Sequence, residues 1–254
     1  MHYSTTMEEK TVRKFGLIGK DIDYSFSRGY FAEKFSQEKL NHCQYLNYDC
    51  ATIEEVFTTL KQTDCVGLNV TIPYKEKIIP ALDGLAPQAK EIGAVNTVVF
   101  HADGRREGHN TDAYGFERAL FDQWTPKNPK ALILGTGGAS KAIAYVLKKK
   151  GIHIQYVSRS SLNNTLTYNQ LTPALIATHE LIVNCTPLGT YPNTSEAPPI
   201  PYNALSDQHL LFDLIYNPPM TEFMKRGQAK GAKTINGMQM LIHQAERSWS
   251  LWNS

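Results

Sequence analysis

The sequence contains no apolar run long enough to cross a membrane. A membrane-spanning helix needs about 20 consecutive, mostly apolar residues, and no stretch of these 254 residues approaches that length. Residues 1–14 are polar and lack the apolar stretch of a secretory signal peptide. We therefore expect a protein of the cytoplasm that makes no contact with a membrane.

Cysteine is scarce, and neither sign of charge dominates. The four cysteines include no C-x-x-C pair, which excludes a disulfide framework and favours a reducing compartment. The formal net charge is only +2, so we expect no nucleic-acid partner. The eight histidines show no ligand spacing and no H-E-x-x-H motif, so we expect no metal site. Hydrophobic residues make up 42% of the chain, enough for one large core or two modest ones.

The first part of the chain alternates short apolar strands with helices, which is typical of an α/β layer. One helix is predicted to begin near Thr52, because Thr52 and Glu55 have the spacing of a capping box, in which two side chains cap backbone N–H groups reciprocally. The other predicted elements are strands over 14–19 and 43–48 and a helix over 29–40.

Residues 94–110 predict a β-hairpin. Two segments rich in strand-forming residues flank a short polar turn that contains Asp103 and Gly104, and this dipeptide is typical of hairpin turns. Because the two arms of a hairpin lie side by side, Asn96 and Asp112 would end up as neighbours.

Beyond residue 127 the alternation of strands and helices becomes stricter. Apolar strands separated by helices are typical of a parallel sheet covered on both faces. The change of pattern near Thr111 predicts two domains, one formed by 1–111 and completed by 237–254, the other formed by 112–236. The predicted strands of this part cover 131–135, 152–158, 180–186 and 210–216, and the predicted helices cover 140–150 and 237–252.

A glycine-rich turn joins the first of these strands to its helix. Gly135 would permit a tight turn, and Gly137 would let the backbone approach a pyrophosphate bound at the helix N-terminus. The strict G-x-G-x-x-G pattern fails at Ser140, and a glycine turn between a strand and a helix is common in any α/β protein. Its position directly after an apolar strand nevertheless favours dinucleotide binding over a structural turn.

The end of the second strand favours NADP over NAD. An NAD site usually has an acidic residue there, but no Asp or Glu occurs between Asp122 and Glu180. The strand ends instead in Ser158, Arg159 and Ser160, and a guanidinium flanked by hydroxyl groups suits a 2′-phosphate. A solvated arginine at a strand end is the structural alternative.

A group of polar residues lies at predicted strand ends in the first half of the chain. Taken singly, each is more often structural. Together they suit a small polyhydroxylated acid, since a lysine beside a carboxylate can protonate a carbonyl oxygen. Ser25 and Ser27, two residues apart on a predicted extended segment, could bind the carboxylate of such a ligand. The group consists of Asn69, Thr71, Lys75, Asn96 and Asp112.

Eight segments match the motifs of one enzyme family in order and approximate spacing. They are GLIGKDIDYSFS (16–27), NVTIPYKE (69–76), IGAVNTVV (92–99), GHNTDAYGF (108–116), LGTGGASKA (134–142), VNCTPLG (183–189), FDLIY (212–216) and NGMQMLIHQA (236–245). In these segments the chain resembles the shikimate dehydrogenase family. The resemblance implies reversible, NADPH-dependent reduction of 3-dehydroshikimate to shikimate, on the route to chorismate and the aromatic amino acids. It also implies a substrate domain and a Rossmann domain with a cleft between them.

The resemblance assigns roles to individual residues. Lys75 is implied as the catalytic lysine and Asp112 as its partner. The implied substrate-binding residues are Ser25, Ser27, Thr71, Lys75, Asn96, Asp112 and Gln244. The implied cofactor-binding residues are Gly135, Thr136, Gly137, Gly138, Ala139, Ser140, Ser158, Arg159, Ser160, Thr186, Leu188, Tyr216, Gly237 and Met240. The long connection 186–201 is expected to border the nicotinamide.

The chain departs from the family pattern in two places. Tyr24 and Arg28 stand where the family usually has histidine and proline around S-x-S, which affects the shape of that loop. Segment 161–164 lacks the second arginine that commonly follows the first, so the preference for NADP over NAD should be weaker.

Other functions fit parts of the pattern. One alternative is an enzyme of the quinate/shikimate branch of the family, which accepts quinate and often NAD. The other is a relative that binds a ligand without catalysis and acts as a sensor or regulator. The presence of both Lys75 and Asp112 disfavours the sensor, and the lack of G-x-S-x-G disfavours a hydrolase. The expected partner is a small-molecule substrate, and the protein is expected to be a monomer or a homodimer.

Overall fold

The computed structural model describes residues 11–23, 25–161 and 164–254. Contacts within the chain divide it into two compact units. Unit 1 comprises the described residues up to Ala86, together with Val95–His109 and Leu251–Ser254, and unit 2 comprises Pro87–Ala94 and Asn110–Ser250. The chain therefore passes between the units four times. The domain limits expected from the sequence stay a prediction.

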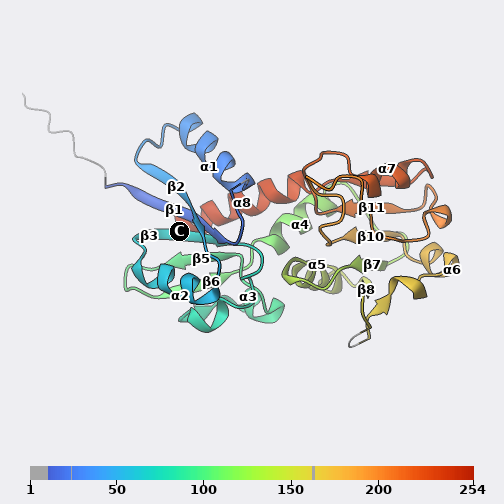
Figure 1. Ribbon diagram of the computed structural model, residues 1–254, viewed down its shortest axis with the longest axis horizontal. Coiled ribbons are helices and arrows are strands. Elements are labelled where there is room, and N and C mark those ends of the chain that lie inside the picture. Colours follow the sequence, from blue (N-terminus) through green and yellow to red (C-terminus); the bar gives the residue numbers. More distant parts are fainter. Residues whose placement is uncertain (1–10, 24, 162–163) are drawn as a thin grey trace, which may run out of the picture. The chain divides into compact units, whose positions relative to one another are not determined.

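Unit 1 is built on a mixed six-stranded sheet in the order β2-β1-β3-β5-β6-β4. Strand β1 pairs in parallel with β2 and β3, and β5 runs antiparallel to β3 and β6. The strands are β1 Arg13–Gly19, β2 Cys43–Asp49, β3 Cys65–Val70, β4 Gly84–Leu85, β5 Thr97–Phe100 and β6 Arg106–His109. Its helices are α1 Phe26–Gln37 and α2 Ile53–Gln62, with the 3-10 turn η1 at Ile79–Ala81 (Figure 1).

An aromatic cluster fills the core of unit 1. The ring of Phe31 stacks on Tyr45 with 4.6 Å between centroids, and the ring of Phe15 lies 5.0 Å from Trp252. The indole of Trp252 also covers Gly67, where a β-carbon would collide with it. Trp252 Nε1 donates to Val98 O over 3.0 Å, so the indole satisfies its only polar group while it is buried.

Unit 2 is built on an all-parallel six-stranded sheet in the order β12-β11-β10-β7-β8-β9. This is the strand order of the doubly wound dinucleotide-binding fold, in which the chain adds strands on one side of β7 and then, from β10 onward, on the other side. The strands are β7 Lys130–Leu134, β8 His153–Ser158, β9 Leu166–Thr167, β10 Leu181–Asn184, β11 Leu210–Asp213 and β12 Lys233–Ile235. The helices are α3 Pro87–Ile92, α4 Asp112–Phe121, α5 Gly138–Lys149, α6 Pro173–Ala177, α7 Glu222–Gln228 and α8 Met238–Trp252, with 3-10 turns η2 Tyr168–Gln170 and η3 Tyr202–Ala204. The last two residues of α8 belong to unit 1.

Both faces of the parallel sheet are covered by helices. Ala131 and Ile133 of β7 belong to a core with residues of α4 and α5, whereas Leu132 and Leu134 belong to a core with residues of α6 and α7. Successive side chains of a strand point to opposite faces. This is why the apolar runs of the sequence are continuous rather than alternating, and it confirms the predicted α/β fold class.

Most local predictions are confirmed, with two differences. The hairpin forms as β5 and β6, and Gly104 takes the left-handed conformation, φ +86°, in its turn. Thr52 caps α2 by accepting from the N–H of Glu55, but the Glu55 carboxylate accepts from Ala51 rather than from Thr52. Helix α1 begins at Phe26 and not at residue 29.

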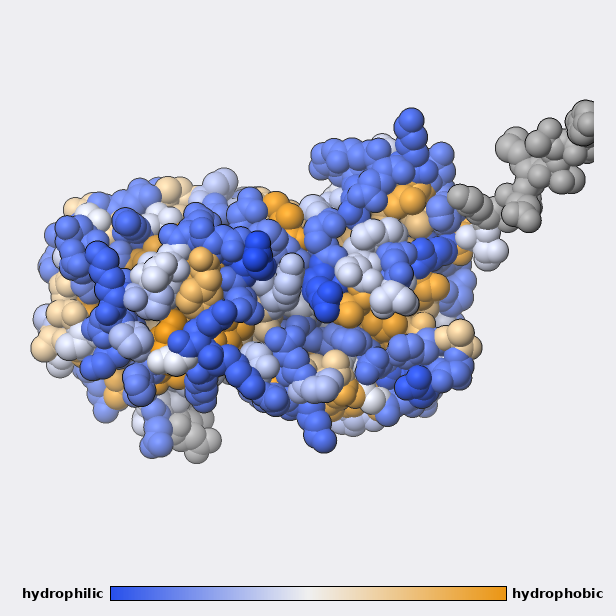
Figure 2. Space-filling model, turned by 180° about the vertical axis from the view of Figure 1, so that it is seen from behind, coloured by the Kyte–Doolittle hydropathy of each residue, from blue (hydrophilic) through white to orange (hydrophobic). Residues whose placement is uncertain are grey.

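The surface seen in Figure 2 is largely hydrophilic, with hydrophobic residues in separate patches. Exposed apolar residues are normal on the surface of folded proteins. Within the described ranges, none of the helices is both long and apolar enough to span a bilayer.

Candidate active site

The glycine turn of unit 2 lies at the point where the sheet reverses its strand order. Gly135 has φ +102°, and a β-carbon there would lie 3.2 Å from the backbone of Cys185. A β-carbon at Gly137 would meet no atom within 4 Å. Helix α5 begins directly afterwards, and Ser140 Oγ donates to Gly137 O over 2.6 Å. Glycine at position 135 therefore suits the left-handed backbone of the turn and its close approach to Cys185. The space at Gly137 and the N–H groups of α5 fit a diphosphate.

The residues predicted to bind the 2′-phosphate lie at the carboxyl end of β8. Ser158 is the last residue of this strand and pairs with Thr167 of β9, while Arg159 and Ser160 are exposed. Burial raises the pKa of Tyr168 to about 12, and the positive charge of Arg159 acts in the opposite direction.

The two departures from the family pattern lie partly where the structure gives no description. Tyr24 lies outside the described residues, as do residues 162–163 of the segment 161–164. Arg28 is exposed on α1.

The remaining predicted cofactor residues follow β10 and β11 or open α8. Thr186, Leu188 and Tyr216 are half-buried, whereas Gly237 and Met240 are buried. Residues 185–201 form no helix or strand, which confirms the long connection expected there.

Three fully buried polar residues next to these loops were missed by the sequence analysis. Each is 0% exposed. For two of them the available signal was a polar residue ending an otherwise apolar strand, as in LIVN and LLFD. The three residues are Asn184, Asp213 and Thr221.

In unit 1, the two predicted serines occupy different environments. Helix α1 begins between them, so Ser25 is its N-cap residue and Ser27 lies buried within its first turn. The expectation of a shared extended segment was wrong. Ser27 hydrogen-bonds Tyr45, whose pKa is raised by burial, and the Tyr45 hydroxyl donates to Asn69 Oδ1 over 2.7 Å.

The ends of β3 and β5 bring the other predicted residues of unit 1 together. Asn69 Nδ2 donates to the backbone oxygen of Asn96 over 3.3 Å, and the Val70 N–H donates to the same oxygen over 2.8 Å. The backbone oxygen of Lys75 accepts from Val95 over 2.7 Å. Asn69 and Asn96 are each 3% exposed, so both are positioned by the sheet itself.

Thr71 is positioned by the end of β1. Its N–H donates to Ile18 O over 2.9 Å, and its methyl group occupies the space that a β-carbon at Gly19 would take. The glycine that ends β1 therefore makes room for Thr71.

Asp112 and Gln244 lie in unit 2, where α4 meets α8. Asp112 is the first residue of α4 and is 5% exposed, and Gln244 is 6% exposed. The hydroxyl of Thr111 lies 3.4 Å from Gln244 Oε1, and a β-carbon at Gly115 would collide with the backbone of Met240. Glycine at position 115 therefore allows the two helices to approach closely.

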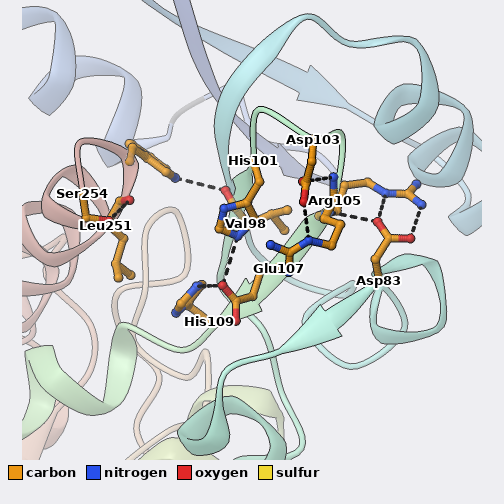
Figure 3. A network of polar contacts seen from close by, with 11 residues as sticks. Asp83, Val98, His101, Asp103, Arg105, Glu107, His109, Leu251 and Ser254 are labelled. Atoms are coloured by element: carbon orange, nitrogen blue, oxygen red, sulfur yellow. Dashed lines mark hydrogen bonds and ion pairs between the residues drawn. The ribbon is translucent and has the colours of Figure 1, made fainter.

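The hairpin holds Asn96 beside the last residue of β6. The Asn96 N–H donates to His109 O over 3.0 Å, and His109 is the last hairpin residue. Figure 3 shows Glu107 Oε2 between the imidazoles of His101 and His109, at 3.1 and 3.4 Å, which fixes the two arms. Three covalently joined residues span about 11 Å at most, so Asp112 stays within that distance of His109.

Comparison with known proteins identifies the family. A family model described as the shikimate dehydrogenase substrate binding domain matches residues 17–98. The shikimate dehydrogenase (NADP(+)) of Desulforamulus reducens is 35% identical over 93% of this chain and 88% of its own length. The chain belongs to the shikimate dehydrogenase family.

Solved structures of the shikimate dehydrogenase family agree with the fold. The Thermus thermophilus shikimate 5-dehydrogenase, solved with NADP(H) and shikimate, is 30% identical, with a TM-score of 0.84 over 95% of this chain and 93% of that one. A quinate dehydrogenase from Corynebacterium glutamicum, solved with NAD, is 28% identical, with a TM-score of 0.84 over 96% and 94%. The resemblance found in the sequence motifs is confirmed.

Proposed function

We propose that this protein catalyses the reversible, NADPH-dependent reduction of 3-dehydroshikimate to shikimate, a step on the route to chorismate and the aromatic amino acids. The observation that supports this most is the match over 93% of the chain to a shikimate dehydrogenase (NADP(+)). The doubly wound sheet with its open glycine turn, and the polar residues gathered at the ends of β3 and β5, supply the two binding sites that such a reaction needs.

The residues of unit 2 fit an NADP-type cofactor. The N–H groups at the start of α5 can bind the diphosphate, because the helix dipole and the open space at Gly137 both favour an anion there. Arg159 is exposed at the end of β8 and can bind a 2′-phosphate through its guanidinium. When bound, NADPH supplies a hydride to the ketone carbon of the substrate.

Lys75 is proposed to donate the proton that the carbonyl oxygen needs as it becomes an alkoxide. Asp112 is proposed to orient the ammonium group of Lys75 and to bind ring hydroxyls. The hairpin supports this pairing, because it holds Asn96 against His109 and thereby limits the reach of the following residues. Ser25 and Ser27 are proposed to bind the carboxylate, with Thr71, Asn96 and Gln244 completing the substrate contacts.

The finer organisation is also proposed. Residues 1–111 with 237–254 form the substrate domain, an assignment supported by the family model over 17–98, and 112–236 bind NADP. The protein acts in the cytoplasm on a small-molecule substrate as a monomer or homodimer.

Substrate and cofactor assays separate the proposed function from its nearest alternative. Oxidation of shikimate and of quinate is followed by nicotinamide absorbance, each with NADP+ and with NAD+. We expect the highest kcat/KM with shikimate and NADP+. The likeness to a quinate dehydrogenase solved with NAD makes quinate oxidation with NAD+ the second candidate. A higher kcat/KM with quinate and NAD+ would replace the proposed function by that one, and turnover of neither substrate would refute both.

A further inference from the structure

The carboxyl group of Asp213, at the carboxyl end of β11, is fully buried and accepts hydrogen bonds from three neutral groups. Oδ1 accepts from Asn184 Nδ2 over 3.0 Å and from the Ile215 N–H over 3.1 Å. Oδ2 accepts from Thr221 Oγ1 over 2.6 Å. Burying a carboxylate is costly unless its oxygens are hydrogen-bonded, so these three donors are what make the position tolerable.

One of these donors extends the network into the loop that follows β10. Asn184 Oδ1 accepts from both the N–H and the hydroxyl of Thr186, over 3.0 and 2.7 Å. The Thr186 hydroxyl in turn accepts from the Leu188 N–H over 3.3 Å. The orientation of the Asn184 amide therefore sets the path of the loop through Thr186 and Leu188, two of the proposed cofactor contacts.

The backbone donor extends the network toward α8. Ile215, held by Asp213, accepts from the Gly237 N–H through its own oxygen over 3.0 Å. A β-carbon at Gly237 would collide with the oxygen of Leu214. Ile215, which precedes Tyr216, and Gly237, which precedes α8, are thus held together next to Asp213.

The third donor fixes α7 behind these loops. Thr221 is the N-cap residue of α7 and accepts from the Met224 N–H over 3.3 Å while its hydroxyl donates to Asp213. In doubly wound sheets, ligands bind at the carboxyl ends of the strands. One side chain therefore connects every segment that supplies a proposed contact at the nicotinamide end of the cofactor.

We propose that Asp213 is a positioning residue, which fixes the loops after β10 and β11 for the nicotinamide half of NADP(H). This inference rests on the proposed function. The adenine half depends on different segments, the α5 N-terminus and the end of β8, so the two halves can be tested separately.

The test compares two ligands by titration calorimetry. NADPH occupies both halves of the site, whereas adenosine 2′,5′-bisphosphate occupies only the adenine half. For Asp213→Asn, we expect the Kd of NADPH to rise about tenfold, the effect of losing one hydrogen bond to a charged group. The Kd of the bisphosphate should change less than about twofold, and kcat with shikimate should fall together with NADPH affinity.

Threonine variants provide a matched control. Thr221→Val removes the cap of α7 and the donor to Asp213, whereas Thr172→Val removes only the equivalent cap of α6, where Thr172 accepts from Leu175 over 3.2 Å. We expect Thr221→Val to weaken the binding of NADPH but not of the bisphosphate, and Thr221→Ser to restore the affinity for NADPH. We expect no selective loss of NADPH affinity for Thr172→Val. If Asp213→Asn does not fold, the comparison of Thr221→Val with Thr221→Ser tests the positioning role instead.

Each result points one way. Equal losses for both ligands, or equal effects of Thr221→Val and Thr172→Val, would overturn the positioning role and reduce Asp213 to general stability. A wild-type protein that does not bind NADPH would overturn the proposed function, and this inference with it.

Discussion

Replacing Asp213 by asparagine should change how the free energy of unfolding depends on pH. Burial raises the pKa of Asp213 from 3.8 to about 6, and its hydrogen bonds with Thr221, Ile215 and Asn184 only partly oppose this. A raised pKa in the folded state means that the folded protein holds the proton more tightly than the unfolded chain. The resulting stability is fully present below pH 3.8 and is lost as the pH rises through about 6.

The magnitude follows from the size of the shift. Each pKa unit corresponds to 1.36 kcal/mol, so the complete effect is about 3 kcal/mol, of which about 2 kcal/mol is lost between pH 4.5 and 7. Asparagine does not titrate. The unfolding free energy of the wild type minus that of Asp213→Asn should therefore fall by about 2 kcal/mol across this range.

Urea denaturation of both proteins at half-unit pH intervals measures this difference. Most other titrating groups contribute equally to both proteins and cancel. The exceptions include the thiol of Cys185 and the hydroxyl of Tyr202, because burial and the charge of Asp213 both raise their pKa values. Both groups therefore titrate above the pH range used. A difference that stays constant, or that grows with pH, would refute the conclusion that burial raises the pKa of Asp213 in the folded protein.

Three further substitutions test other parts of the molecule. Lys75→Ala should cost several kcal/mol in kcat/KM while the Kd of shikimate changes little, and near wild-type turnover would remove Lys75 from the mechanism. Gly67→Ala should destabilise the protein by about 1–3 kcal/mol in thermal or urea unfolding, since the new methyl group collides with Trp252; an unchanged midpoint would show that the indole can move aside. Arg159→Ala should weaken NADPH binding about tenfold and leave NADH binding unchanged; equal effects on both cofactors would mean that Arg159 does not bind the 2′-phosphate.

The periodicity of the sequence was sufficient to predict the α/β fold class. Continuous apolar runs such as 131–135 predicted strands buried on both faces, and the two cores on either side of β7 explain why. The polar turn with Asp103 and Gly104 predicted a hairpin, and the antiparallel pairing of β5 with β6 confirms it. In both cases the signal is local, because each depends on residues close together in the chain.

The parts that the sequence could not predict depend on contacts between distant residues. The hydrogen bonds of Tyr45 with Ser27 and Asn69 join three separate elements, and no spacing rule indicates them. A polar residue that ends an apolar strand, as Asp213 does, can face a ligand or bond internally. Sequence alone does not distinguish the two, since both place the residue at the same end of the strand.

The placement of Trp252 has a consequence for how the protein is made. Its indole closes the aromatic core around Phe15 and Phe31, yet it is synthesised long after them. During translation the segments that form most of unit 1 leave the ribosome well before Trp252, the side chain that completes their core. Until Trp252 is added, the nascent unit must therefore expose the apolar surface around Phe15 and Phe31, which makes it a segment for chaperones to protect.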